Sequence, residues 1–161
     1  MTKLAMPKID RKLISKKAEV VANLKKIINA ENVLDHVDLT RPFETDALSA
    51  YKQKPLAVVF PENTKEVSKI LAYCNKERIK VVPRGAGTGL SGGALPLEDC
   101  ILLCLSKFNK IINIDFKNRC VIAQPGVTNL SITEAVEDKG FYYAPDPSSQ
   151  IACSIGGNVA E

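Results

Sequence analysis

Apolar residues recur along the chain with two different spacings. Between residues 11 and 30 they stand three or four positions apart, which predicts an amphipathic helix with a basic outer face. Asn63 and Glu66 resemble a capping box before another run of that spacing, so a second helix is expected over residues 63–74. A third helix is predicted at residues 129–139, ending at Gly140. Short apolar runs predict a buried strand at residues 56–60 and further strands at residues 79–83, 101–105, 111–114 and 120–124.

The order of these elements predicts an α+β fold in two parts. Strand, helix and strand within residues 56–83 form a βαβ unit, whose crossover is expected to be right-handed. The later strands are short and separated by polar turns, so antiparallel hairpins are expected from residue 101 onward. We divide the chain into an N-terminal helical segment, residues 1–50, and a main domain, residues 51–161.

The two parts meet at a glycine loop, residues 83–96, which reads PRGAGTGLSGGALP and holds five of the nine glycines. No Lys-Ser or Lys-Thr pair follows its last glycine, which excludes a P-loop. The spacing G-x-G-x-x-G occurs once, but a predicted strand follows it instead of the helix that a dinucleotide fold requires. Consecutive amides of such a loop can bind an anion, with Arg84, Thr88 and Ser91 as further donors. A tight turn without a ligand is the alternative.

Composition and charge place the chain among globular proteins. It has 161 residues, of which 45% are hydrophobic and 25% charged, with a formal net charge of +4. Basic residues are dense in the first 26 positions without interleaved aromatic residues, which is typical of a solvated helix face, so no nucleic-acid partner is predicted. No secretory signal pattern and no apolar run of bilayer length is present, so a cytoplasmic location is expected.

Five cysteines and one histidine limit the metal chemistry to be expected. The cysteines form no C-x-x-C pair, and His36 lies far from them in the sequence, so no metal site is predicted. Cys100 and Cys104 are four positions apart in a strand-like segment, which places both on one of its faces. All five cysteines are interpreted as buried free thiols of a reducing compartment.

Four stretches resemble the FAD-binding domain of the vanillyl-alcohol-oxidase, or PCMH-type, family of flavoproteins. They are RPFETDALSAY at residues 41–51, the glycine loop, QPGVTN at residues 124–129 and YYAPDPSSQIACSIGGNVAE at residues 142–161. Within that family they are most similar to the FAD-linked subunits of bacterial glycolate oxidases. The resemblance implies an α+β, PCMH-type FAD-binding domain with a small βαβ subdomain, followed by the start of a mixed or antiparallel α+β subdomain that is truncated.

The resemblance also implies which residues contact FAD. The glycine loop would wrap the pyrophosphate through Pro83, Arg84, Gly85, Ala86, Gly87, Thr88, Gly89, Leu90 and Ser91. A second wall would come from Pro145, Asp146, Ser148, Ser149, Cys153, Ser154, Gly156, Gly157 and Asn158. The residue types agree, because the Pro-Asp-Pro run restricts its backbone and paired glycines permit close approach of a ring or ribose. An ordinary surface loop is the alternative for this second wall.

By the same resemblance, the protein would oxidise a small 2-hydroxy acid such as glycolate by hydride transfer to FAD. Electrons would leave through other glycolate oxidase subunits, including an iron-sulfur subunit, and these partners would bring the protein to the inner membrane. The family places its catalytic and metal-binding residues after residue 161, so none is assigned, and the chain looks like a fragment that is inactive alone. The alternatives are oxidation of D-lactate or another D-2-hydroxy acid, a nucleotide-binding module without redox chemistry, and a non-catalytic structural fragment.

Overall fold

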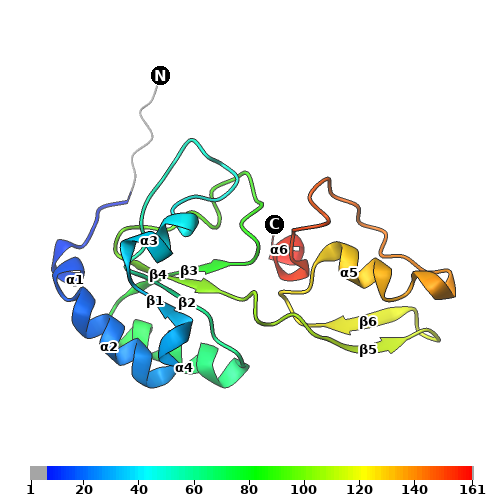
Figure 1. Cartoon of the computed structure of the whole chain (residues 1–161), viewed down its shortest axis with the longest axis horizontal. Helices are drawn as coiled ribbons and strands as arrows, with labels where there is room; N and C mark the ends of the chain where they lie inside the picture. Colours follow the sequence, from blue (N-terminus) through cyan, green and yellow to red (C-terminus); the bar gives the residue numbers. More distant parts are fainter. Residues whose placement is uncertain (1–6, 161) are drawn as a thin grey trace.

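The computed structural model describes residues 7–160, and the first part of the chain folds around a four-stranded sheet (Figure 1). β4 pairs in parallel with both β2 and β3, whereas β1 is antiparallel to β2, giving the order β1-β2-β4-β3. The chain thus passes from β2 to β3 across the position of a strand that comes later in the sequence. The strands are β1 (Val33–Leu34), β2 (Ala57–Val59), β3 (Lys80–Arg84) and β4 (Cys100–Cys104).

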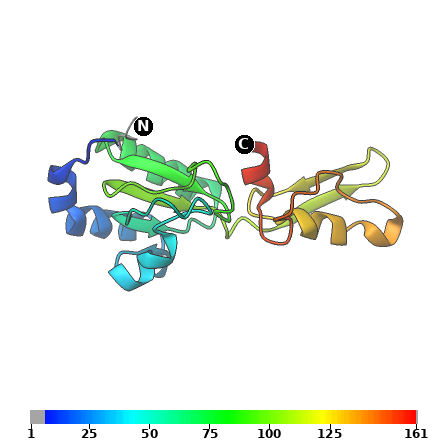
Figure 2. The ribbon, with the colours of Figure 1, turned by 90° about the horizontal axis from the view of Figure 1, so that it is seen from above.

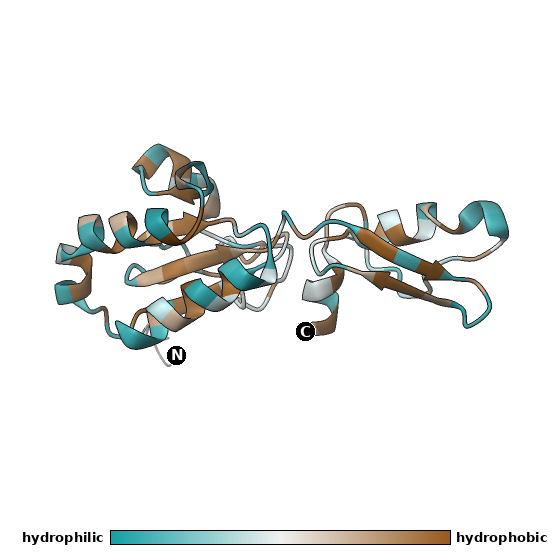
Figure 3. Ribbon diagram, turned by 90° about the horizontal axis from the view of Figure 1, so that it is seen from below, coloured by the Kyte–Doolittle hydropathy of each residue, from teal (hydrophilic) through white to brown (hydrophobic). Residues whose placement is uncertain are grey.

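Side chains bury this sheet on both faces. Helices α2 (Lys17–Ile27) and α4 (Thr64–Lys76) cover one face, where Ile70 packs against Ile101 within the larger core. Leu102 lies in a smaller apolar cluster with aromatic side chains. The central strands are brown in Figure 3, whereas both helices alternate teal and brown. Burial on two faces explains why these strands read as continuous apolar runs. The connection from α2 to β2 contains 3₁₀ turns at Ala30–Asn32 and Arg41–Phe43, and α3 (Val37–Thr40).

The prediction of one continuous helix over residues 11–30 is wrong. The chain forms α1 (Arg11–Ser15) and then α2, separated at Lys16, whose φ of −93° and ψ of 11° leave the helical range. Asp10 begins α1 by accepting two backbone amides. At the other end Ile28 adopts an extended backbone and is buried in the core, so the last part of the apolar pattern is not helical.

The predicted α4 is confirmed, but its capping box has a different return bond. Oδ1 of Asn63 accepts the Glu66 amide at 3.0 Å, as expected. The Glu66 carboxylate accepts the amide of Glu62, at 2.8 Å, instead of the amide of the capping residue itself. A cap of this kind stabilises a helix by about 1 kcal/mol.

β4 corrects the expectation that hairpins begin at residue 101. It is the central strand of the parallel sheet, with Ile101 between Ala57 and Val81. All five residues of β4 are buried, so both faces of the sheet are covered at this strand. In a hairpin one face would be exposed to solvent. The glycine loop belongs to the crossover from β3 to β4, which contains no helix.

The second part of the chain is a two-stranded hairpin beside short helices (Figure 2). The two strands pair antiparallel as expected, with an irregularity in register between Ile111 and Asn113. The predicted third helix ends early, and Gly140 adopts the left-handed φ of 76° expected after a helical segment. The elements are β5 (Ile111–Asp115), β6 (Cys120–Ala123), α5 (Asn129–Glu134), a 3₁₀ turn (Glu137–Lys139) and α6 (Ile155–Ala160).

All five cysteines are free, but they are not all buried. Cys120 is exposed because it opens β6, where alternate residues face solvent, so the expectation is wrong at this position. Burial raises the pKa of the Cys104 thiol to about 12, and those of Cys74 and Cys100 to about 11. These three thiols therefore stay protonated and unreactive near neutral pH.

A buried carboxylate connects the N-terminus of α1 to the sheet. Asp99 immediately precedes β4, and its Oδ2 accepts Nζ of Lys80 and the amide of Asp10, both at 2.7 Å. Burial alone would raise the pKa of Asp99, but the hydrogen bonds from Lys80 and from the Asp10 amide outweigh it and lower the pKa. The charged form of Asp99 therefore favours the folded state.

We expect Asp99→Asn to destabilise the protein at neutral pH and much less in acid. Because the folded pKa of Asp99 lies below its unfolded pKa, its contribution is fully present above the unfolded value and is lost as the pH falls through the folded value. Urea unfolding should show a difference of about 1–3 kcal/mol near neutral pH. Asp138→Asn, at an exposed position, is the control. A difference that does not shrink in acid contradicts this assignment.

Candidate cofactor site

A cleft of about 470 Å³ lies between the glycine loop and residues 153–160, which include α6. Figure 1 shows α6 beside the loops at the end of the sheet. Twelve of the eighteen predicted contacts line the cleft, so the fold brings two segments together that are far apart in the sequence. From the glycine loop these are Pro83, Arg84, Gly85, Ala86, Gly87, Thr88 and Gly89. From the second segment they are Cys153, Ser154, Gly156, Gly157 and Asn158.

Six predicted contacts do not line this cleft. The backbone carbonyls of Pro147 and Ser149 accept amides of residues 150, 152 and 153, so this stretch forms the turn that delivers Cys153 to the cleft. The sequence also missed five lining residues. All of these except Leu105 had a signal, since they lie in the stretches that resemble the family. The six that do not line the cleft are Leu90, Ser91, Pro145, Asp146, Ser148 and Ser149. The five missed residues are Gly93, Ala94, Leu105, Pro125 and Ala160.

The backbone amides of the glycine loop are its principal chemical feature. Within residues 7–160, no protein acceptor takes an amide between Gly85 and Ala94. The loop instead uses its carbonyls: Gly87 O accepts the amide of Ala47 at 2.9 Å, and Gly92 O accepts the amide of Leu95 at 3.2 Å. A loop that folds through its carbonyls keeps its donors free for an anion.

Glycine is required at this site for space as well as for conformation. Gly87 has a φ of 75°, and a Cβ there would overlap the Arg84 guanidinium. A Cβ on Gly85 would overlap the Ser154 hydroxyl, which belongs to the opposite side of the cleft. A Cβ on Gly156 would lie 2.6 Å from Cβ of Pro125, far inside van der Waals contact. A side chain at residue 85 or 156 would therefore require its neighbours to move, whereas at residue 87 the positive φ itself favours glycine.

Arg84 differs from the donor that we expected at the mouth of the loop. The residue is only 9% exposed, and its Nη1 donates to the carbonyl of Thr45 at 2.7 Å and to that of Ala94 at 3.4 Å. Its guanidinium carbon also lies 5.7 Å from the centroid of the Phe43 ring. The side chain therefore supports the loop from beneath, and the amides are the groups at the mouth.

The second wall is anchored to the segment around residues 125–129. The Asn129 amide donates to Cys153 O at 3.1 Å, the Ile155 amide to Val127 O at 2.8 Å and the Gly156 amide to Pro125 O at 2.9 Å. Nδ2 of Asn158 is buried without a hydrogen-bond partner among residues 7–160, and Asn158 lines the cleft. An unpaired buried donor is costly, so this nitrogen is suited to a ligand acceptor.

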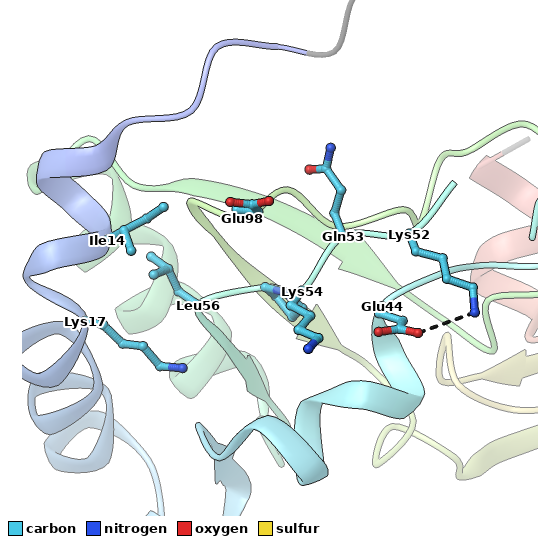
Figure 4. Close-up of a pocket in the computed structure, with 9 residues that line it drawn as sticks. Ile14, Lys17, Glu44, Lys52, Gln53, Lys54, Leu56 and Glu98 are labelled. Carbon is cyan, nitrogen blue, oxygen red and sulfur yellow. Dashed lines mark ion pairs between the residues drawn. The ribbon is translucent and has the colours of Figure 1, made fainter. Parts of the chain in front are cut away.

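A second cleft, of about 520 Å³, lies between the first helices and residues 52–56 (Figure 4). It is lined by apolar side chains and by charges of both signs, with Lys52 paired to Glu44 at 3.5 Å. It has neither free consecutive amides nor glycine contacts, so we do not assign it to a cofactor. Within residues 7–160, no three potential metal ligands lie together.

The geometry of the first cleft fits a large anionic cofactor. Free amides suit phosphate oxygens, the glycine positions leave room for close approach, and Asn158 offers an additional donor. The volume lies in the range of cofactor and ligand pockets, roughly 300–1,000 Å³.

Known proteins resemble this chain in sequence and in fold. A family model described as FAD binding domain matches residues 55–161. The glycolate oxidase subunit GlcD of Escherichia coli K12 is 49% identical over 157 residues, which cover 98% of this chain and 30% of that protein. D-lactate dehydrogenase of Anaerostipes hadrus is 35% identical over 143 residues, covering 88% of this chain and 30% of that protein.

A solved structure confirms the expected PCMH-type fold. The crystal structure of p-cresol methylhydroxylase with substrate bound superposes with a TM-score of 0.68 at 24% identity, over 78% of this chain and 25% of that one. This chain spans about 30% of the length of the two relatives. The family match covers more than half of the chain, including both walls of the cleft, and so the chain belongs to the FAD-binding domain family.

Proposed function

We propose that this chain is the FAD-binding part of a flavoprotein that oxidises a small 2-hydroxy acid, with glycolate as the favoured substrate. The observation that carries the proposal is the run of free amides from Gly85 to Ala94 at a cleft whose walls both lie in the matched family region. The substrate class is supported by the relatives, which are named as a glycolate oxidase subunit and a D-lactate dehydrogenase.

In this proposal the glycine loop holds the pyrophosphate of FAD. The amides of residues 85–89 would donate to phosphate oxygens, with the Thr88 hydroxyl beside them. Ser154, Asn158 and the paired glycines at 156 and 157 would form the wall for the adjoining part of the cofactor. Leu90, Ser91, Pro145, Asp146, Ser148 and Ser149 stay predicted contacts from the edges of these two segments.

FAD would supply the redox chemistry, as the acceptor of the hydride from the substrate α-carbon. The chain's own residues would bind the cofactor, orient it and restrict the access of water. The cleft is lined by only two titratable side chains, Arg84 and Cys153, and Arg84 is engaged by backbone carbonyls. His36 does not line the cleft and caps α3. We therefore assign no catalytic residue and propose that the substrate-binding groups come from further segments of the complete polypeptide.

The proposal includes partners and a location. Because the relative from E. coli is named as a subunit, we propose that electrons pass to other subunits, among them an iron-sulfur protein. In the part of the chain that the structure describes, no helix is long and apolar enough to span a bilayer. We propose a cytoplasmic protein that partner subunits bring to the inner membrane, with residues 1–50 as a helical segment and residues 51–161 as the FAD-binding domain.

Spectroscopy of the complete polypeptide tests this function. The purified protein should be yellow, and anaerobic addition of glycolate should bleach the flavin absorbance. Faster bleaching by D-lactate would favour the alternative substrate that the Anaerostipes hadrus relative suggests. Bound flavin that no 2-hydroxy acid bleaches would contradict the proposed activity, and a colourless protein that binds nucleotides would favour a module without redox chemistry.

We expect Gly87→Val in the complete polypeptide to lower FAD affinity at least about tenfold. Valine disfavours the φ of 75° at this position, and its Cβ would displace the Arg84 guanidinium that supports the loop. Flavin content per protein and a fluorescence titration with FAD measure the loss. Lys69→Ala, at an exposed position of α4, is the control and should retain wild-type flavin content. Equal flavin content in both variants contradicts a role for the loop.

Residues 1–161 alone should bind FAD weakly and show no oxidation of glycolate or D-lactate. The cleft offers donors for phosphate but no free base and no partner for a substrate carboxylate among its lining residues. Without positioned groups, both orientation and transition-state stabilisation are missing. A dye-linked assay with added FAD measures turnover against free FAD as the blank. Turnover clearly above that blank contradicts this division of roles.

A further inference from the structure

A compact loop at residues 44–53 lies against the glycine loop. Its two ends are joined, because the Gln53 amide donates to Glu44 O at 2.7 Å and Lys52 pairs with the Glu44 carboxylate at 3.5 Å (Figure 4). The matched family region starts at residue 55, so this loop lies outside it. Loops of this length with joined ends pack as units of their own on the protein surface.

Hydrogen bonds within the 44–53 loop fix its tip. Oδ1 of Asp46 accepts the Leu48 amide at 3.0 Å, and Ala47 O accepts the Ser49 amide at 3.0 Å. Asp46 is only 5% exposed, which is unusual for an acidic side chain and shows that the tip is packed. The tip therefore has a defined shape before it meets any other segment.

Two hydrogen bonds join this tip to the glycine loop, and a third connects the two ends of the glycine loop to each other. The Ala47 amide donates to Gly87 O at 2.9 Å, and Nη1 of Arg84 donates to Thr45 O at 2.7 Å and to Ala94 O at 3.4 Å. Arg84 stands near the start of the glycine loop and thereby connects the tip with Ala94, near the end of that loop. Within residues 7–160 it forms no ion pair with a carboxylate, so its polar partners are these carbonyls.

We propose that the 44–53 loop and Arg84 together are the positioning element that holds the glycine loop in its anion-binding shape. This inference rests on the proposed function. Within residues 7–160 the amides from Gly85 to Ala94 have no acceptor, and ordering a glycine-rich segment costs more entropy than ordering other residues. Contacts made before the cofactor arrives remove part of that cost from binding, which raises affinity through preorganisation. Arg84 is thus a positioning residue that acts through the loop.

Two substitutions separate hydrogen bonding from simple charge. Arg84→Met keeps the aliphatic stem and removes charge and donors, whereas Arg84→Lys keeps the charge but loses the planar guanidinium whose Nη1 donates to two carbonyls. Both should raise the dissociation constant for FAD about tenfold or more in the complete polypeptide. Arg11→Met, at an exposed position on α1, is the matched control and should bind FAD normally. Wild-type affinity in Arg84→Lys would overturn the proposal, because charge alone would then suffice.

Hydrogen exchange of the apo-protein tests the same element without FAD. The Ala47 amide should be protected in the wild type and should exchange at least about tenfold faster in both Arg84 variants, while the Leu102 amide in β4 keeps its protection. Faster exchange at both amides would indicate general destabilisation and overturn the proposal. Unchanged exchange at Ala47 would overturn it as well. If the wild type fails to bind FAD but its Ala47 amide behaves as expected, the proposed function is wrong. The role of the 44–53 loop and Arg84 in holding the glycine loop is then still supported.

Discussion

The backbone amides from Gly85 to Ala94 have no acceptor among residues 7–160, so this segment can keep one shape only if contacts of other groups hold it. In this chain the parallel pairing of Arg84 with Cys104 fixes the place where the glycine loop leaves the sheet. The carbonyl of Gly87 is bonded to Ala47, and the carbonyl of Ala94 is reached by the Arg84 side chain. These contacts hold the loop through its carbonyl groups or through its junction with β3. Its amides from Gly85 to Ala94 are therefore available to a ligand.

The same constraint explains the architecture around the loop. β4 must be buried on both faces, so it lies between β2 and β3, and the chain from β3 has to cross over to reach it. That crossover passes over the end of the sheet, where α6 and the turn at residues 125–128 meet it. The close approaches of Gly85 to Ser154 and of Gly156 to Pro125 show how little space separates these segments. A small change in the pairing of β3 and β4 would therefore alter the cleft.

Local signals in the sequence were sufficient for many of these elements. The apolar runs of β2 and β3, the cap of α4 at Asn63 and the left-handed Gly140 each depend on a few neighbouring residues. The glycine loop could be predicted as a candidate anion-binding segment because glycine spacing is itself a local property. The break at Lys16 and the exposure of Cys120 were missed, since they follow from how each segment packs against the rest.

The remaining errors concern partners far apart in the sequence. Nothing within β4 states that it pairs with β2 and β3, and a run of five apolar residues is compatible with several sheets. Likewise the sequence does not show that Arg84 turns beneath its own loop toward Thr45, 39 positions earlier. Such choices are decided by burial and by long-range hydrogen bonds, which a one-dimensional pattern does not contain.

The buried guanidinium gives the site an electrostatic character that the amides alone would lack. A charge removed from water is costly unless it is well solvated by the protein, and carbonyl oxygens together with the Phe43 ring provide that solvation for Arg84. The charge then lies beneath the amides, where the low dielectric of the interior lengthens its reach toward an anion at the mouth. The loop amides at the mouth of the cleft and the Arg84 charge beneath them are both fixed. They would therefore need little reorganisation on binding of an anion. Because both depend on contacts with residues 45–47, the structural unit proposed to bind the cofactor begins before residue 55, where the match to the family model starts.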